Sequence, residues 1–280
     1  MNLTKITQTE YSDISENVLK ETKVDDSVLK TLHDLFLEHH DFHSIKIGEE
    51  MRTYSPYYTA LKKRDMVYER ADISAISREL GKYYSSDLDP SVGLFLSALV
   101  NFHYFKNPAN DEYILFLDES KKAVDDLCFR NKANVRIIGN AGIWLCNSMQ
   151  SGRVYVEGTA GEAAGINLKD GYLQINGNTG SFLGDSMRNG TILVQGNAWL
   201  KSGARMQGGI IHVYGESTDD NGWKMNGGEL HLHGKIKRDF FLGEEMTGGK
   251  IIAYEKLVQF NGCLIKSGEV YEKGKRVYPK

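Results

Sequence analysis

The feature that most constrains this chain of 280 residues is a repeat in its second half. A similar short segment recurs there, opened by an apolar residue that usually has a glycine three positions before it. A fixed period of this length is typical of solenoid proteins, in which each repeat stacks on the next. The opening residues are Met149, Leu168, Met187, Met206, Met225, Met246 and Ile265, and the steps between them are 19, 19, 19, 19, 21 and 19 residues.

Each copy contains one strand in which apolar residues alternate with others, the period-two pattern of β structure. A unit of 19 residues cannot bury its apolar face alone, whereas stacked copies bury it continuously. The repeat therefore predicts a right-handed parallel β-helix of about eight coils over residues 129–280. A left-handed hexapeptide helix requires six-residue units instead, which this pattern does not show. The inward pairs are Val135/Ile137, Val154/Val156, Leu173/Ile175, Ile192/Val194, Ile211/Val213, Leu230/Leu232 and Ile251/Ala253.

The first part of the chain differs in composition. Of the 29 glycines, only Gly48, Gly81 and Gly93 precede residue 130. Helical spacing and helix-start residues predict helices near 25–36, 73–80 and 91–100, the last of them buried, and a short helix over 121–128. Residues 113–117 have the pattern of a strand that leads towards the β-helix. We therefore predict an α+β chain with a mostly helical N-terminal domain, residues 1–128, that caps the first coils.

The glycines between strands form the motif G-x-x-G-x-x-x-G, as in Gly158, Gly161 and Gly165. This pattern resembles the GXGXG β-helix family, which includes the C-terminal domain of the glutamate synthase large subunit and a β-helical component of formylmethanofuran dehydrogenase. The resemblance covers residues 130–280. It implies a rigid spacer that carries catalytic modules of an oxidoreductase complex without doing chemistry itself. No cofactor is implied, because the nucleophilic cysteine and the cysteine cluster of such enzymes have no counterpart here.

Composition argues against several other classes. A net charge of −3 with no concentrated basic run is atypical of a nucleic-acid binder. No apolar run approaches the roughly 20 residues that cross a bilayer, and no secretory signal is apparent. Cys128, Cys146 and Cys263 form no CxxC pair, so we expect buried thiols and a cytoplasmic location. The sequence has neither a P-loop nor a G-x-S-x-G nucleophile motif.

Two histidine clusters are candidate sites. On a helix, His39 and His43 would share a face at the i,i+4 spacing that many metal sites use, although a solvated helix end also explains them. The repeat register places His212 above His231 on adjacent coils, with His233 two residues along. Imidazoles stacked in this way are close enough to share a metal ion or a proton.

The outward positions of the strands also form a stripe of aromatic and aliphatic residues, which usually marks a contact surface. These observations favour a non-catalytic scaffold that acts through protein–protein contacts, with other subunits or by self-association. The alternative is an enzyme or a ligand- or metal-binding protein with a histidine-containing site where the two domains meet. The candidate interface residues are Tyr155, Leu193, Ile210, His212, Tyr214, His231, His233, Ile252, Tyr254 and Tyr271.

Overall fold

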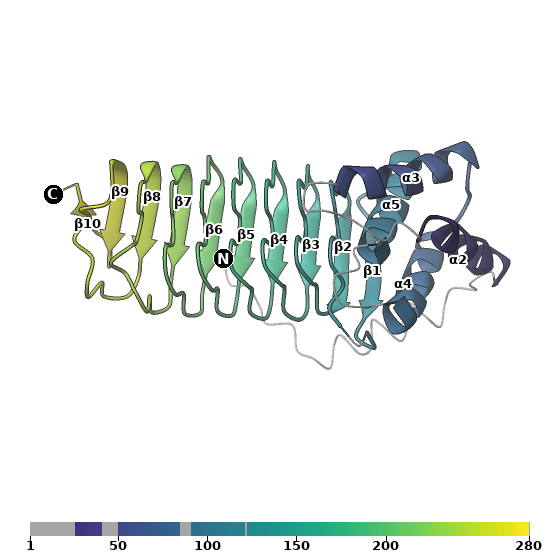
Figure 1. Ribbon diagram of the computed structural model, residues 1–280, viewed down its shortest axis with the longest axis horizontal. Helices are drawn as coiled ribbons and strands as arrows, with labels where there is room; N and C mark the ends of the chain where they lie inside the picture. Colours follow the sequence, from purple (N-terminus) through teal and green to yellow (C-terminus); the bar gives the residue numbers. More distant parts are fainter. Residues whose placement is uncertain (1–25, 41–49, 85–90, 121, 280) are drawn as a thin grey trace.

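The computed structural model describes residues 26–40, 50–84, 91–120 and 122–279. The helices in these ranges lie together at one end of the molecule (Figure 1). None of the helices in the described ranges combines the length and apolar character that a membrane span requires. The helices are α2 (Asp26–His40), α3 (Glu50–Lys63), α4 (Arg70–Tyr84) and α5 (Ser91–Lys106).

Helix α5 is the centre of the helical part. Its sequence is apolar on nearly every side, and residues 92–100 are all buried. A helix that is apolar all round is stable in water only when other elements surround it. Helices α3 and α4 both pack on α5, and α4 also packs on the first strand of the sheet. The buried helix predicted for 91–100 is therefore confirmed.

The rest of the molecule is a parallel β-solenoid (Figure 1). Ten strands form one sheet in chain order, with β1 to β9 parallel and β10 antiparallel to β9. The predicted fold, helices followed by a parallel solenoid of about eight coils with a 19-residue period, is confirmed. The strands are β1 (Glu112–Leu117), β2 (Asn134–Gly139), β3 (Arg153–Val156), β4 (Tyr172–Ile175), β5 (Thr191–Val194), β6 (Ile210–Val213), β7 (Asn226–Leu232), β8 (Thr247–Ala253), β9 (Ser267–Glu272) and β10 (Lys275–Tyr278).

The sheet begins earlier than the repeat suggests. Strand β1 pairs in parallel with β2 from Glu112 to Leu117, so the segment expected only to lead towards the solenoid is its first strand. The short helix predicted for 121–128 is wrong. The described part of this segment is a turn in which Val124 forms a parallel bridge with Ala141, and the Asp126 N–H donates to the Ile143 carbonyl at 2.9 Å. Hydrogen bonds to the next coil thus replace those of a helix.

The solenoid core consists of the inward pairs and a column of methionines. Every inward pair predicted from the alternation is buried, with at most 1% of each side chain exposed. The five methionines that open repeats are fully buried, as expected for flexible side chains that fill irregular gaps. Of the three thiols predicted to be buried, Cys128 and Cys146 are, whereas Cys263 is exposed in the loop before β9, where the stack ends.

The glycine-rich turns have a distinctive backbone. In the turn between β4 and β5, Phe182, Gly184 and Ser186 all have positive φ (63°, 64° and 57°). Their N–H groups point alternately to the two neighbouring coils, since Gly184 donates to Ala164 and Ser186 to Ala204. The same alternation recurs in other coils, so these turns form hydrogen bonds both to the coil before and to the coil after. The glycine motif therefore encodes how the coils stack.

Candidate functional site: the outward face of the sheet

The outward side chains of the sheet form columns because equivalent residues of neighbouring strands pair in register, and the irregularities in β7 and β8 lie before Glu229 and Lys250. His212 pairs with His231, as the repeat register predicts, and Leu193 lies beside His212 on the preceding strand. A second column, two residues earlier, contains Ile210, Glu229 and Lys250. The central column comprises Arg136, Tyr155, Gln174, Leu193, His212, His231, Ile252 and Tyr271.

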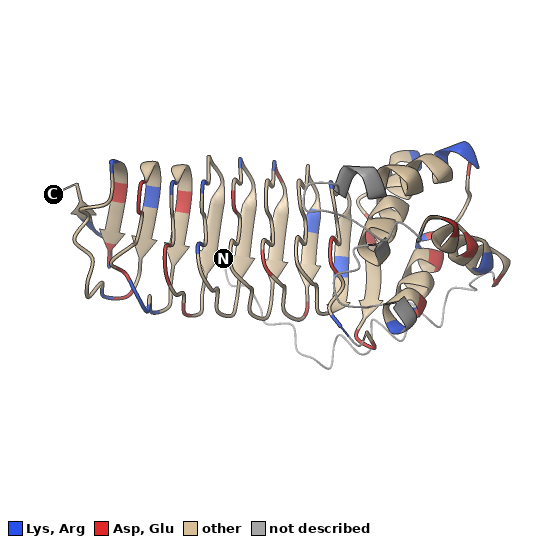
Figure 2. Cartoon of the chain, in the orientation of Figure 1, with Lys and Arg blue, Asp and Glu red and all other residues tan. Residues whose placement is uncertain are grey.

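Charge divides this face into a centre and two ends. Strands β4, β5 and β6 contain no Lys, Arg, Asp or Glu, as Figure 2 shows. At one end Arg136 forms ion pairs with Glu112 (2.8 Å) and Glu157 (3.1 Å). At the other end Lys250 lies 3.4 Å from Glu229. An uncharged centre is thus flanked by charged groups that neutralise one another.

The candidate interface residues differ in exposure. Tyr214 (41% exposed) and Tyr254 (44%) are the most open of them, whereas Leu193 is only 5% exposed. Leu193 is therefore buried although its position is outward, and it offers little surface to a partner. The other seven are half-buried: Tyr155, Ile210, His212, His231, His233, Ile252 and Tyr271.

The described helices do not cover this face. They gather at the β1 end, and strands β3 to β9 extend away from them (Figure 1). The main contact between a helix and the sheet is that of α4 with β1. Among the described elements, the N-terminal helices therefore cap the start of the solenoid and leave the central face open.

Three histidines and two tyrosines meet where β6, β7 and β8 lie side by side. His212 Nδ1 lies 3.2 Å from His233 Nε2. The ring of His233 stacks between those of Tyr214 (centroids 4.3 Å apart) and Tyr254 (4.2 Å). His231 Nε2 lies 3.2 Å from a Glu229 carboxylate oxygen, and its Nδ1 lies 3.2 Å from the Tyr254 hydroxyl. The register thus brings together all three histidines singled out from the sequence.

The environment of His212 and His233 disfavours their charged forms and lowers the pKa of each. Burial, reinforced by the neighbouring His231 and His233, lowers the pKa of His212 to about 4. Burial also lowers the pKa of His233, with a further contribution from His231. A charged imidazolium is unfavourable in a half-buried position beside other imidazoles.

These pKa shifts predict a pH-dependent stability. The folded-state pKa of His212 lies below the ordinary value of 6.5, so protonation favours the unfolded chain. The stabilisation of the folded state that comes from neutral His212 is complete above pH 6.5 and is lost as the pH falls towards 4. His212 changes the free energy of unfolding by at most about 1.4 kcal/mol per pH unit, and its partial exposure to solvent reduces this effect.

Urea unfolding of the wild type and His212→Asn between pH 4 and pH 7 measures this effect. We expect the substitution to flatten the pH dependence, whereas Gln174→Asn, in the same column, leaves it unchanged. Equal slopes for His212→Asn and wild type would contradict the assignment.

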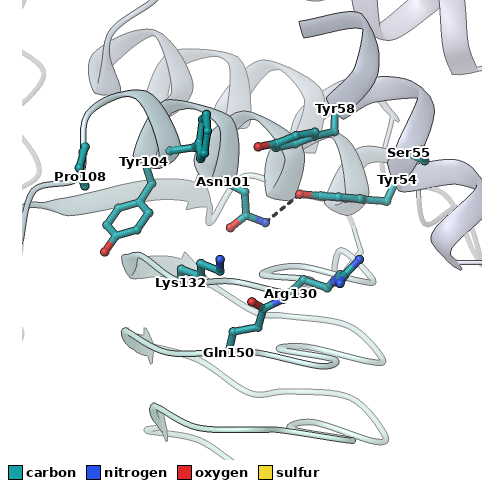
Figure 3. Close-up of a pocket in the computed structure, with 10 residues that line it drawn as sticks. Tyr54, Ser55, Tyr58, Asn101, Tyr104, Pro108, Arg130, Lys132 and Gln150 are labelled. Atoms are coloured by element: carbon teal, nitrogen blue, oxygen red, sulfur yellow. Dashed lines mark hydrogen bonds between the residues drawn. The ribbon is translucent and has the colours of Figure 1, made fainter. Parts of the chain in front are cut away.

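A separate pocket of about 520 Å³ lies between the helices and the first turns of the solenoid (Figure 3). Within it, Asn101 donates to the Tyr54 hydroxyl (3.1 Å) and to the Phe129 carbonyl (3.0 Å). None of the ten described residues that line it is a histidine, so this pocket does not favour the alternative hypothesis of a histidine-containing site at the junction. The lining residues are Tyr54, Ser55, Tyr58, Asn101, Tyr104, Phe105, Pro108, Arg130, Lys132 and Gln150.

The other predicted histidine pair is only partly described. His39 lies near the end of α2, with its ring edge-on to Tyr57 (centroids 6.0 Å apart). His43 lies outside the described residues. The metal site predicted at this pair therefore stays a prediction.

Sequence reasoning overlooked exposed apolar residues in the turns. Trp199 is 62% exposed and Leu200 is 40% exposed, in the turn after β5. Phe240 and Phe241 (38% and 37%) lie in a corresponding turn two coils later, with their rings 5.0 Å apart. The sequence contained a signal for this exposed residue. Trp199 occupies a repeat position at which the earlier copies have Gly142, Gly161 and Gly180.

The fold and its outward face define a class of protein, a β-solenoid that presents a repeat-built surface. Comparison with family models identifies the family: residues 91–226 match the model described as GXGXG motif. The predicted resemblance to the GXGXG family is thereby confirmed over these residues. The match begins at α5 rather than at residue 130 and ends at the start of β7. A search of curated proteins finds no match, so the resemblance to two particular enzymes stays a prediction.

Proposed function

We propose that this chain is a non-catalytic assembly module, whose solenoid binds other protein subunits or a second copy of itself through its outward face. The observation that carries this proposal is the uncharged centre of the sheet over β4 to β6, bounded by charged pairs at both ends. Interface cores are depleted in charge and enriched in aromatic residues, and their rims are polar. Tyr172, Tyr214 and Tyr254 supply aromatic rings in or beside this centre.

The solenoid also suits a spacer. About eight coils at roughly 4.8 Å each make a rod of about 38 Å with one continuous core. Such a rod holds modules at a fixed separation without large hinge motions. The resemblance to the spacers of glutamate synthase and formylmethanofuran dehydrogenase favours an oxidoreductase complex as the host.

One substitution on the face tests the proposal. Ile210 is an uncharged, half-buried residue of β6. The substitution Ile210→Glu therefore adds one negative charge to the uncharged centre and removes none. Burying an unpaired carboxylate at an interface is costly. We expect recovery of the partner, or of the self-associated species, to fall by at least about tenfold, which corresponds to about 1.4 kcal/mol.

The measurement is a gentle affinity purification from the native cell, followed by sizing of the complex and identification of its components. Gln207→Glu is the matched control, because it adds the same charge at an exposed position in the turn before β6. Thermal unfolding checks that both variants fold. A chain that emerges alone and monomeric, or a partner retained equally by Ile210→Glu, would overturn the proposal.

A further inference from the structure

The histidine cluster has the geometry of a metal site. One ring nitrogen from each of His212, His231 and His233 lies within 4.8 Å of the other two. Zinc–nitrogen bonds of about 2.0–2.1 Å in a tetrahedral site place two ligating nitrogens about 3.4 Å apart. The separation between His212 Nδ1 and His233 Nε2, 3.2 Å, is close to that value. Two of the three donors are therefore already at the spacing that an ion would impose.

We propose that His212, His231 and His233 together bind one divalent transition-metal ion of the zinc type, with a fourth coordination position open towards solvent. This site goes beyond the assembly role, because neither the fold nor the family requires it. Three histidines with an open position form a ligand set that proteins use for zinc. Calcium and magnesium are unsuitable, since both prefer oxygen ligands.

The surrounding side chains hold the ligands in place. Tyr214 and Tyr254 stack on the two faces of the His233 ring and restrict its rotation. The Glu229 carboxylate lies 3.2 Å from His231 Nε2. A carboxylate that accepts a hydrogen bond from a ligating histidine orients the ring and raises the basicity of its other nitrogen.

A hydrogen bond between two neutral imidazoles is the simpler explanation of the contact between His212 and His233. It accounts for that pair, and the Tyr254 hydroxyl and the Glu229 carboxylate provide hydrogen-bond partners for His231. The two explanations differ in their response to an added ion. A hydrogen-bonded pair responds to an ion in the same way with or without His231, whereas the metal site requires all three rings.

The test is a titration of the purified full-length chain with Co²⁺, followed by competition with Zn²⁺. Tetrahedral Co²⁺ has intense visible absorption, which reports the geometry directly. We expect about one equivalent of tetrahedral Co²⁺ per chain, displaced by Zn²⁺. His231→Asn and His233→Asn should each weaken Co²⁺ affinity by more than about 100-fold, beyond the 10–100-fold typical of losing a group that only orients a ligand.

Two controls separate this site from other histidines. His33→Asn, on α2, and a variant with His39, His40 and His43 all replaced by Asn should both bind Co²⁺ like the wild type. Circular dichroism checks that every variant folds. The proposal is overturned if the wild type gives no tetrahedral spectrum, if His231→Asn and His233→Asn bind like the wild type, or if the variant at residues 39–43 loses the signal.

Discussion

Replacing Gly93 by alanine is expected to lower the free energy of unfolding by about 3 kcal/mol or more, near the upper end of what overpacking costs. Gly93 lies in the first turn of α5, where the helix crosses the turn before β2. A Cβ atom at this position would lie 1.7 Å from the Asp125 carbonyl oxygen. That oxygen belongs to the backbone, so the contact is relieved only if the helix and the turn move apart.

Such a movement would break further contacts. The Ser97 hydroxyl accepts a hydrogen bond from the Phe129 N–H (3.1 Å) and lies 3.1 Å from the Asp126 carbonyl oxygen. These bonds hold α5 to the same turn and are buried. The gain in helix propensity from glycine to alanine, about 1 kcal/mol, does not offset their loss.

Urea unfolding measures the effect, with Gly81→Ala as the matched control. Gly81 lies in α4, and its nearest neighbour for a Cβ is the Leu117 Cδ2 atom at 3.1 Å, the end of a flexible side chain. We expect Gly81→Ala to be neutral or slightly stabilising. A Gly93→Ala protein within about 1 kcal/mol of the wild type would show that α5 is not locked to the solenoid in this way.

The second large effect is expected in the solenoid itself. At Gly234 a Cβ would lie 2.1 Å from the Gly215 carbonyl oxygen and 2.4 Å from its carbon. This glycine stacks on the equivalent residue of the preceding coil, so Gly234→Ala pushes two coils apart. We again expect a loss of about 3 kcal/mol or more.

Because each coil contacts mainly its neighbours, the damage should be local. Hydrogen exchange should show faster exchange in β7 to β9 while β2 to β4 stay protected. Gly274→Ala is the control in the same column, since no atom lies within 4 Å of a Cβ there. Its positive φ of 79° predicts a smaller loss, about 1 kcal/mol. Uniform exchange along the whole solenoid would contradict this account.

The sequence by itself determined the solenoid. Its strands alternate with period two and its repeats keep a nearly fixed length, so these two regularities alone assign each inward pair and each outward column. The adjacency of His212 and His231 followed from that register, because equivalent residues of neighbouring coils must pair. The family resemblance rested on the same glycines, and the match over residues 91–226 confirms it. At many of these glycines a Cβ would collide with the backbone of the preceding coil, so the stacking favours glycine there.

Only the tertiary structure decided the features that depend on contacts between different coils or on the ends of the stack. The segment at 121–128 has a helical pattern, but in its described part the backbone hydrogen-bonds to the next coil instead. Leu193 lies at an outward position, yet only 5% of it is exposed. The 3.2 Å approach of His212 to His233 is a diagonal contact between coils. A repeat pattern fixes which positions are neighbours, whereas the directions of side chains, and so the chemistry of a site, are set by packing.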